Sequence, residues 1–216
     1  MKKIIIIMAL IILAIIAGIF LITYHKAEAD VTETATKVGV IMNGSKTDRS
    51  WNQAHYEGLE KTAAELNLDI TYKECVTEDK VTEIINGFAK DNCKIIIAGS
   101  FEFGKYMVEG AEKYPEIFFF HATGTESGKN MSSYFGRMYQ MRYLTGIAAG
   151  LQTETNEIGY VAAFPISEVN RGINAFTLGV KSVNPEAKVY VKWTNSWGDN
   201  SLTAEVTEKL ISSHNI

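Results

Sequence analysis

Short apolar runs alternate with longer amphipathic segments along the chain from residue 37 onward. The apolar runs predict strands at 37–42, 69–75, 94–98, 117–121, 158–163 and 188–193, and a short crossing strand at 134–136. The amphipathic segments predict helices at 51–67, 79–91, 103–114, 138–151, 168–183 and 201–214. This alternation is typical of the α/β class with parallel sheets.

The apolar positions also predict which surfaces are buried. The runs at 94–98 and 117–121 are almost continuously apolar, so we expect these strands to be covered by helices on both faces of the sheet. In the helix at 51–67, Leu59, Ala63 and Leu66 share one face, which we expect to turn toward the core.

The predicted elements fall into two groups. We expect an N-terminal α/β lobe at 30–134 and a partial second α/β lobe at 135–216, which has only two long strands. The sequence stops after a helix, where a parallel sheet would need its next strand, so we interpret the chain as truncated. The alternative, a natural stop, would leave the strand at 188–193 as an unprotected edge.

The first 29 residues predict an exported protein. Lys2 and Lys3 precede an apolar run at 4–22, and a small-x-small site follows at 27–29, which together are typical of a signal peptide. The run also has about the 20 apolar residues of a membrane-spanning helix, so an uncleaved N-terminal membrane anchor remains the alternative. In both cases the rest of the chain is expected outside the cytoplasm, membrane-associated through this segment or secreted or periplasmic after cleavage.

Charge and cysteine content exclude several classes of function. Without residues 1–29 the chain has 18 basic against 24 acidic residues, a net charge of −6, so nothing attracts nucleic acid. Cys75 and Cys93 are predicted at opposite edges of a parallel sheet, so we expect two free thiols. Two cysteines at this spacing lack the close second ligand of zinc motifs, and we expect neither a metal nor a cofactor.

The segment 43–54 is the strongest candidate for a binding site. It contains Asp48, Trp51 and Asn52, and it follows the first predicted strand, so these residues are expected at the carboxyl edge of the sheet, where open α/β proteins bind ligands. Trp51 offers a stacking face and Asn52 an amide to a flat heterocycle. The alternative is that Trp51 is a hydrophobic staple and Asn52 part of the helix cap.

Other predicted strand ends carry further candidates. Ser100 and Phe101 follow the third strand, and His121 ends the fourth, although a structural role is its alternative.

Phe164 follows the first strand of the second lobe, and Trp197 and Asp199 follow the next one. Trp197 has the same relative place as Trp51, so we expect the two rings to stack on the two faces of a planar ligand. Asp199 could instead cap the last helix.

Enzyme signatures are missing from the sequence. There is no Gly-x-Ser-x-Gly elbow, no P-loop, no His-Glu-x-x-His and no glycine fingerprint for a dinucleotide. We therefore expect a protein that binds a ligand without converting it.

Several motifs occur together and in a recognisable order. They are Asp48-Arg49-Ser50-Trp51-Asn52-Gln53, the Tyr139-to-Gly150 segment, Gly159 to Pro165, Asn174 to Gly179, and Trp193-x-x-Ser196-Trp197-x-Asp199. From about Lys37 to the last residue, the chain resembles the BMP family, the basic membrane protein or PnrA-like solute-binding proteins of ABC transporters.

The resemblance implies a type I periplasmic-binding-protein fold of two Rossmann-like lobes with parallel sheets. It also implies capture of a purine nucleobase or nucleoside in the interlobe cleft and delivery to an ABC transporter permease in the membrane. Trp51 and Trp197 match the family's two stacking aromatics, and Asn52 matches the amide that reads the base.

Departures from the family pattern bear on the ligand. Where the family has acidic residues after the first strand and at the end of the fourth, this chain has Met42-Asn43 and His121, so a free base and a nucleoside both stay open. A second class of function also stays open, a truncated paralogue that senses a ligand without transport or that is vestigial.

Overall fold

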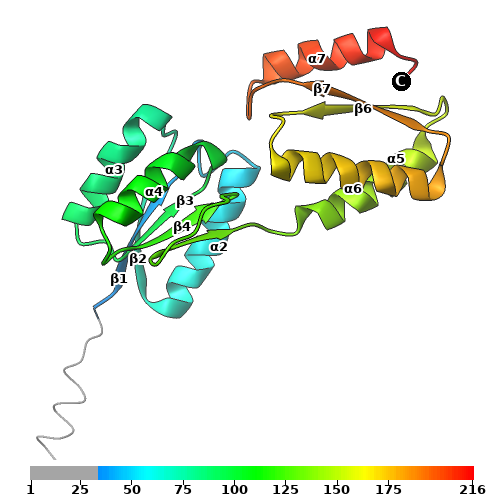
Figure 1. Ribbon diagram of the computed structural model, residues 1–216. Coiled ribbons are helices and arrows are strands. Elements are labelled where there is room, and N and C mark those ends of the chain that lie inside the picture. Colours follow the sequence, from blue (N-terminus) through cyan, green and yellow to red (C-terminus); the bar gives the residue numbers. More distant parts are fainter. Residues whose placement is uncertain (1–33) are drawn as a thin grey trace, which may run out of the picture. The chain divides into compact units, whose positions relative to one another are not determined.

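The computed structural model describes residues 34–216 (Figure 1). The predicted signal peptide or membrane anchor at 1–29 lies outside these described residues. Among the helices of the described part, none has the length and apolar character needed to cross a membrane.

Seven strands alternate with helices along residues 34–216. The strands are β1 (Thr36–Ile41), β2 (Leu68–Lys73), β3 (Ile95–Ala98), β4 (Phe118–Ala122), β5 (Met131–Tyr134), β6 (Glu157–Ala162) and β7 (Lys188–Trp193). The helices are α2 (Trp51–Leu66), α3 (Glu78–Lys90), η1 (Phe101–Phe103), α4 (Gly104–Lys113), α5 (Met138–Gln152), α6 (Ser167–Val183) and α7 (Asn200–Ser213). The predicted α/β class is confirmed, and apart from the crossing strand each predicted element ends within about two residues of its observed bounds.

The crossing strand predicted at 134–136 was wrong. The chain forms β5 at Met131–Tyr134 instead, and this strand pairs in parallel with β4, with Phe119 opposite Met131. A turn closed by the Gly128 amide and the Met131 carbonyl, 2.8 Å apart, precedes the strand. Burial of the Met131 side chain fixes which face of β5 meets the core.

The described chain divides into two compact units, the first ending at Ile96 and the second spanning Ile97–Ile216. The division falls inside β3, which belongs to a five-stranded sheet of order β2-β1-β3-β4-β5. β6 and β7 form a separate two-stranded sheet. The pairs β1–β2, β4–β5 and β6–β7 are all parallel, so the carboxyl ends within each pair meet at one edge.

In the first unit, α2 and α3 lie on opposite sides of β1 and β2 (Figure 1). α3 packs against β1, and a Cβ at Gly39 of β1 would lie only 2.3 Å from the Phe88 ring of α3. Glycine therefore lets the Phe88 ring lie directly on the strand.

The expectation that Leu66 faces the core was wrong, because Leu66 is the last residue of α2 and is 63% exposed. The next residue, Asn67, adopts the left-handed backbone conformation and ends the helix.

β4 in the second unit is covered on one face only. Phe119 is fully buried, whereas Phe118 is 56% and Phe120 37% exposed. Neighbouring strand residues point to opposite faces, and α4 packs against β4. The expected burial of this strand on both faces was therefore wrong, because an all-apolar run does not show which face a helix covers.

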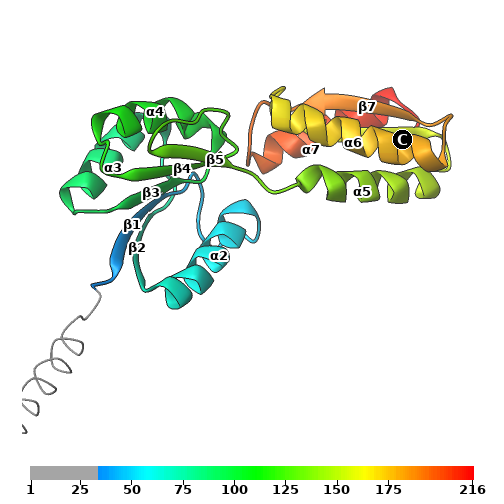
Figure 2. The same cartoon turned by 60° about the horizontal axis from the view of Figure 1, so that its bottom comes forward.

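In the same unit, α7 covers one face of the β6–β7 sheet, while α5 and α6 lie side by side on the other (Figures 1 and 2). Two glycines bring α5 and α6 close together. A Cβ at Gly146 of α5 would lie 2.0 Å from the Phe176 carbonyl oxygen, and a Cβ at Gly179 of α6 would lie 2.0 Å from the Tyr143 carbonyl oxygen.

We predict that Gly146→Ala lowers the free energy of unfolding by about 1–3 kcal/mol, because the new methyl group must push the α6 backbone away. The matched control is Gly58→Ala in α2, where a Cβ meets nothing within 4 Å. This control should stabilise the protein by about 0.5–1 kcal/mol through helix propensity. Urea denaturation followed by circular dichroism measures both changes, and stabilisation by both substitutions would contradict the close packing of α5 and α6.

Candidate functional site

The loop that enters α2 is organised by the carboxylate of Asp48. Its Oδ1 accepts hydrogen bonds from the amides of Ser50 (2.8 Å) and Gln53 (3.0 Å). Its Oδ2 accepts from the Asn52 amide (3.0 Å) and from Asn52 Nδ2 (2.9 Å). Burial alone would raise the pKa of Asp48, but these hydrogen bonds outweigh it and lower the pKa to about 2.

Asn52 lies beneath this loop. It is only 6% exposed, and a Cβ at Gly44 would lie 2.5 Å from its Nδ2. The amide group donates to Asp48, as the helix-cap alternative for Asn52 requires. A contact between Asn52 and a heterocycle stays a prediction.

Trp51 is the first residue of α2 and is partly buried. Its ring lies against the ring of His55, one turn further along, with centroids 4.4 Å apart and planes tilted by 53°. Arg49, two residues earlier, has a φ of 57°, in the left-handed region that costs energy for a residue with a side chain. Asp48 precedes Arg49, and its hydrogen-bond partners Ser50 and Asn52 follow it, so these bonds hold the turn in place. They thereby fix the position at which Trp51 begins the helix.

In the second unit, the ends of β3 and β4 are joined by His121. This residue is 2% exposed, and its Nε2 lies 2.8 Å from the Ser100 carbonyl oxygen. A carbonyl oxygen can only accept, so Nε2 carries the proton and donates it. Burial lowers the pKa of His121, although the Ser100 carbonyl and the charge of Glu102 oppose this, so the ring is neutral at pH 7.

These contacts agree with the structural alternative for His121. A Cβ at Gly124 would lie 2.2 Å from His121 Nδ1, so the chain packs closely against this side of the ring. Ser100 is also buried, and its hydroxyl donates to Glu102 Oε2 at 2.5 Å. Phe101, the next residue, is 36% exposed on η1. Ligand contacts by these residues stay predictions.

Two aromatic rings meet at the carboxyl edge of the β6–β7 sheet. Phe164 follows β6 and Trp197 follows β7, and their ring centroids are 5.1 Å apart with planes tilted by 51°. The strands pair with Ala162 opposite Trp193, so both loops leave the sheet at the same edge. Trp197 remains 43% exposed, so the pair offers an aromatic surface to a ligand.

Asp199 caps the helix that follows this loop. Its Oδ1 accepts a hydrogen bond from the Leu202 amide at 2.9 Å, in the first turn of α7. The capping alternative for Asp199 is therefore what the structure shows, and a contact with a ligand stays a prediction.

Sequence reasoning missed Glu168, in the first turn of α6. Its Oε2 is buried and has no hydrogen-bond partner within the part of the chain that the structure describes. Burial raises the pKa of Glu168, the charge of Arg171 lowers it and the charge of Glu102 raises it. The available signal was an acidic residue soon after the carboxyl end of β6, at the same edge as Phe164.

The structure therefore groups the predicted residues locally. Asp48 and Asn52 are joined in the first unit, and Ser100 is joined to His121, and Phe164 to Trp197, in the second. Stacking of one ligand between Trp51 and Trp197 stays a prediction.

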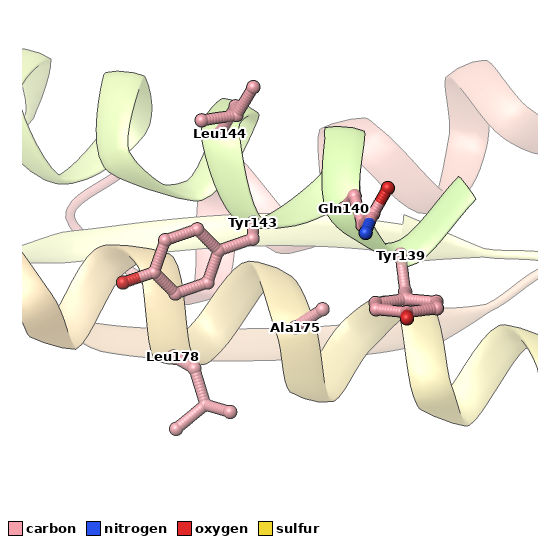
Figure 3. A pocket seen from close by; sticks show the side chains of 6 residues that line it. All are labelled: Tyr139, Gln140, Tyr143, Leu144, Ala175 and Leu178. Carbon is pink, nitrogen blue, oxygen red and sulfur yellow. The ribbon is translucent and has the colours of Figure 1, made fainter. Parts of the chain in front are cut away.

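A hollow of about 490 Å³ lies elsewhere in the second unit, on α5 and α6 (Figure 3). It is lined by Tyr139, Gln140, Tyr143, Leu144, Ala175 and Leu178. None of the predicted site residues lines this hollow.

Comparison with known proteins gives a consistent family. The sequence profile described as "ABC transporter substrate-binding protein PnrA-like" matches residues 35–215. A Haloferax volcanii protein that carries the name of an ABC transporter glucose-binding protein is 41% identical over 165 residues, which are 76% of this chain and 42% of that protein. A Brucella abortus protein named as purine-binding is 36% identical over 182 residues, which are 83% of this chain and 52% of that protein.

Solved structures share the fold. The solute-binding protein of an ABC transporter system from Aeropyrum pernix K1 matches with a TM-score of 0.71 at 20% identity, over 82% of this chain and 52% of that chain. The predicted type I periplasmic-binding-protein fold is thereby confirmed. The chain spans about half the length of the curated relatives named above.

We predict that Asp48→Asn destabilises the protein at pH 7 by about 1 kcal/mol, the usual cost of losing a helix cap, because an amide has one acceptor oxygen where the carboxylate has two. The Asp48 pKa is lowered on folding, so its contribution is present above pH 4 and is lost as the pH falls toward 2.

The stability difference between wild type and Asp48→Asn should therefore be smaller at pH 3 than at pH 7 in urea denaturation. Asp69→Asn on the exposed part of β2 serves as the control. A difference that does not change with pH would contradict the charged cap.

Proposed function

Because the chain belongs to the PnrA-like family of ABC transporter substrate-binding proteins, we propose that it is the extracytoplasmic solute-binding protein of an ABC importer and binds a purine nucleobase or nucleoside. The observation that carries the proposal of a ring-shaped ligand is the Phe164–Trp197 pair, an exposed aromatic surface at the carboxyl edge of β6 and β7. The name of the Brucella abortus relative, a purine-binding protein, favours a purine as that ligand.

Stacking supplies the main attraction in this proposal. Trp51, held at the start of α2 by the Asp48 loop, offers one aromatic face, and Trp197 offers another. By analogy with base stacking, a purine would gain about 1–3 kcal/mol from each aromatic ring on which it stacks.

The polar groups at these strand ends have structural contacts that agree with binding of a ligand without its chemical conversion. Asp48 and Asp199 both cap helices, and His121 is neutral and tied to the Ser100 carbonyl. The hydrogen bonds of these groups stabilise the loops, as a preformed binding site requires. The proposal is therefore capture and release of a solute.

Transport is the role that family membership favours over sensing. The binding protein would present its ligand to a permease in the membrane, and residues 1–29 would direct its export or hold it at the membrane. No observation on the described residues favours the sensing or vestigial alternative.

Glucose is the competing ligand, because the Haloferax volcanii relative is named for glucose binding. Aromatic faces also accept the apolar faces of sugar rings, so stacking alone does not separate the two classes. The test of the proposal therefore includes glucose beside adenine, guanine and their nucleosides.

We predict that Trp51→Ala and Trp197→Ala each weaken purine binding about 5- to 150-fold, because each removes one stacking face worth about 1–3 kcal/mol. Isothermal titration calorimetry of the whole chain measures this, with Phe118→Ala, an exposed aromatic on β4, as the control.

If Trp51 is only a hydrophobic staple, its substitution should instead lower the melting temperature and leave the affinity unchanged. Binding of glucose alone by the wild-type chain would contradict the purine proposal.

A further inference from the structure

Glu168 is a polar group that the local structure leaves unsatisfied. Its Oε2 is buried and accepts no hydrogen bond, although it lies in the first turn of a long helix. Native proteins pair almost all such groups, because a buried oxygen loses its water without compensation. An unpaired carboxylate oxygen therefore calls for a donor that residues 34–216 do not supply.

The neighbours of Glu168 do not supply that donor. Arg171 is near enough for its charge to lower the pKa of Glu168, but the two side chains form no ion pair among the described residues. Glu102 has the opposite effect and raises the pKa of Glu168. The negative charge of a second carboxylate nearby raises the free-energy cost of keeping Glu168 ionised without a hydrogen-bond donor.

A helix-terminal role explains only part of this arrangement. Acidic residues are favourable in the first turn of a helix, because they face the positive end of the helix dipole. That interaction is satisfied by an exposed carboxylate and does not require a buried oxygen without a partner. The burial of Oε2 needs a second reason.

Glu168 lies close in the sequence to the aromatic surface of the proposed site. Glu168 comes four residues after Phe164, and the intervening turn is closed by a 2.8 Å hydrogen bond from the Ile166 amide to the Phe164 carbonyl. Phe164 in turn contacts Trp197. The unpaired oxygen is thus tied by a short stretch of chain to the aromatic surface of the proposed site.

We propose that Glu168 accepts a hydrogen bond from an N–H group of the bound base, whose face stacks on the Phe164–Trp197 pair. This inference rests on the proposed purine function and adds the polar group that recognises the ligand's edge. A carboxylate oxygen accepts and does not donate, so it selects purines with an N–H at that edge over those in which this N–H is absent or methylated.

The test compares Glu168→Gln with the matched control Glu186→Gln, which changes an exposed glutamate between α6 and β7. Calorimetry is run on the whole chain with adenine, with unsubstituted purine, which lacks the amino group, and with 9-methyladenine, which lacks the ring N–H. Glu168→Gln should weaken adenine binding about 10- to 150-fold, the range for a hydrogen bond to a charged group, and Glu186→Gln should not.

The analogue that lacks the N–H accepted by Glu168 should bind the wild-type protein weakly. Its affinity should fall little further in the Glu168→Gln variant. The melting temperature without ligand should stay the same or rise in this variant, since a neutral amide is easier to bury than a carboxylate. A purely structural role predicts the opposite, a lower melting temperature with unchanged affinity.

Several outcomes would overturn the inference. Unchanged adenine affinity in Glu168→Gln, or an equal loss for all three ligands, overturns the role of Glu168 and leaves the proposed function in place. Failure of wild type to bind any purine overturns the proposed function and the inference with it. Glucose binding that depends on Glu168, in place of purine binding, assigns the donor to a sugar hydroxyl and overturns the N–H assignment.

Discussion

Parallel pairing of neighbouring strands is the constraint on which the candidate site depends. In the pair β6–β7, residue Ala162 lies opposite Trp193, so the loops that follow both strands leave at one edge of the sheet. That register brings Phe164 and Trp197 into contact, although 33 positions separate them in the sequence. The pair β1–β2 has the same sense, and the loop after β1 carries Asp48 into the start of α2.

At these strand ends the polar side chains mostly stabilise the loops, and the aromatic rings are the groups that we propose contact the ligand. Asp48 accepts four hydrogen bonds from its own loop and the first turn of α2, and Asp199 caps α7. Trp197, by contrast, keeps 43% of its surface exposed. Rigid loops lower the entropic cost of binding, so internal hydrogen bonds of this kind favour affinity without touching the ligand. Glu168 differs from these two aspartates, since its buried Oε2 has no hydrogen-bond partner among residues 34–216.

Hydrophobic periodicity was enough to place the strands and helices, because long amphipathic segments and short apolar runs are hard to confuse in an alternating pattern. It failed for β5, whose Ser132 and Ser133 break the apolar run, and for β4, where it could not show that Phe118 and Phe120 face away from α4. The aromatic site candidates could be predicted from the sequence because each follows a predicted strand. The internal partners of Asn52 and the unpaired oxygen of Glu168 could not, because both depend on side-chain geometry that the pattern does not contain.

The proposal stands or falls on whether the protein binds a purine in preference to a sugar. Equilibrium dialysis of the whole chain against radiolabelled adenine, with unlabelled adenine or glucose as competitor, tests this most directly. We expect saturable binding that unlabelled adenine displaces and that an excess of glucose leaves unchanged. Displacement of the label by glucose, or no saturable binding of adenine, guanine or their nucleosides, would contradict it.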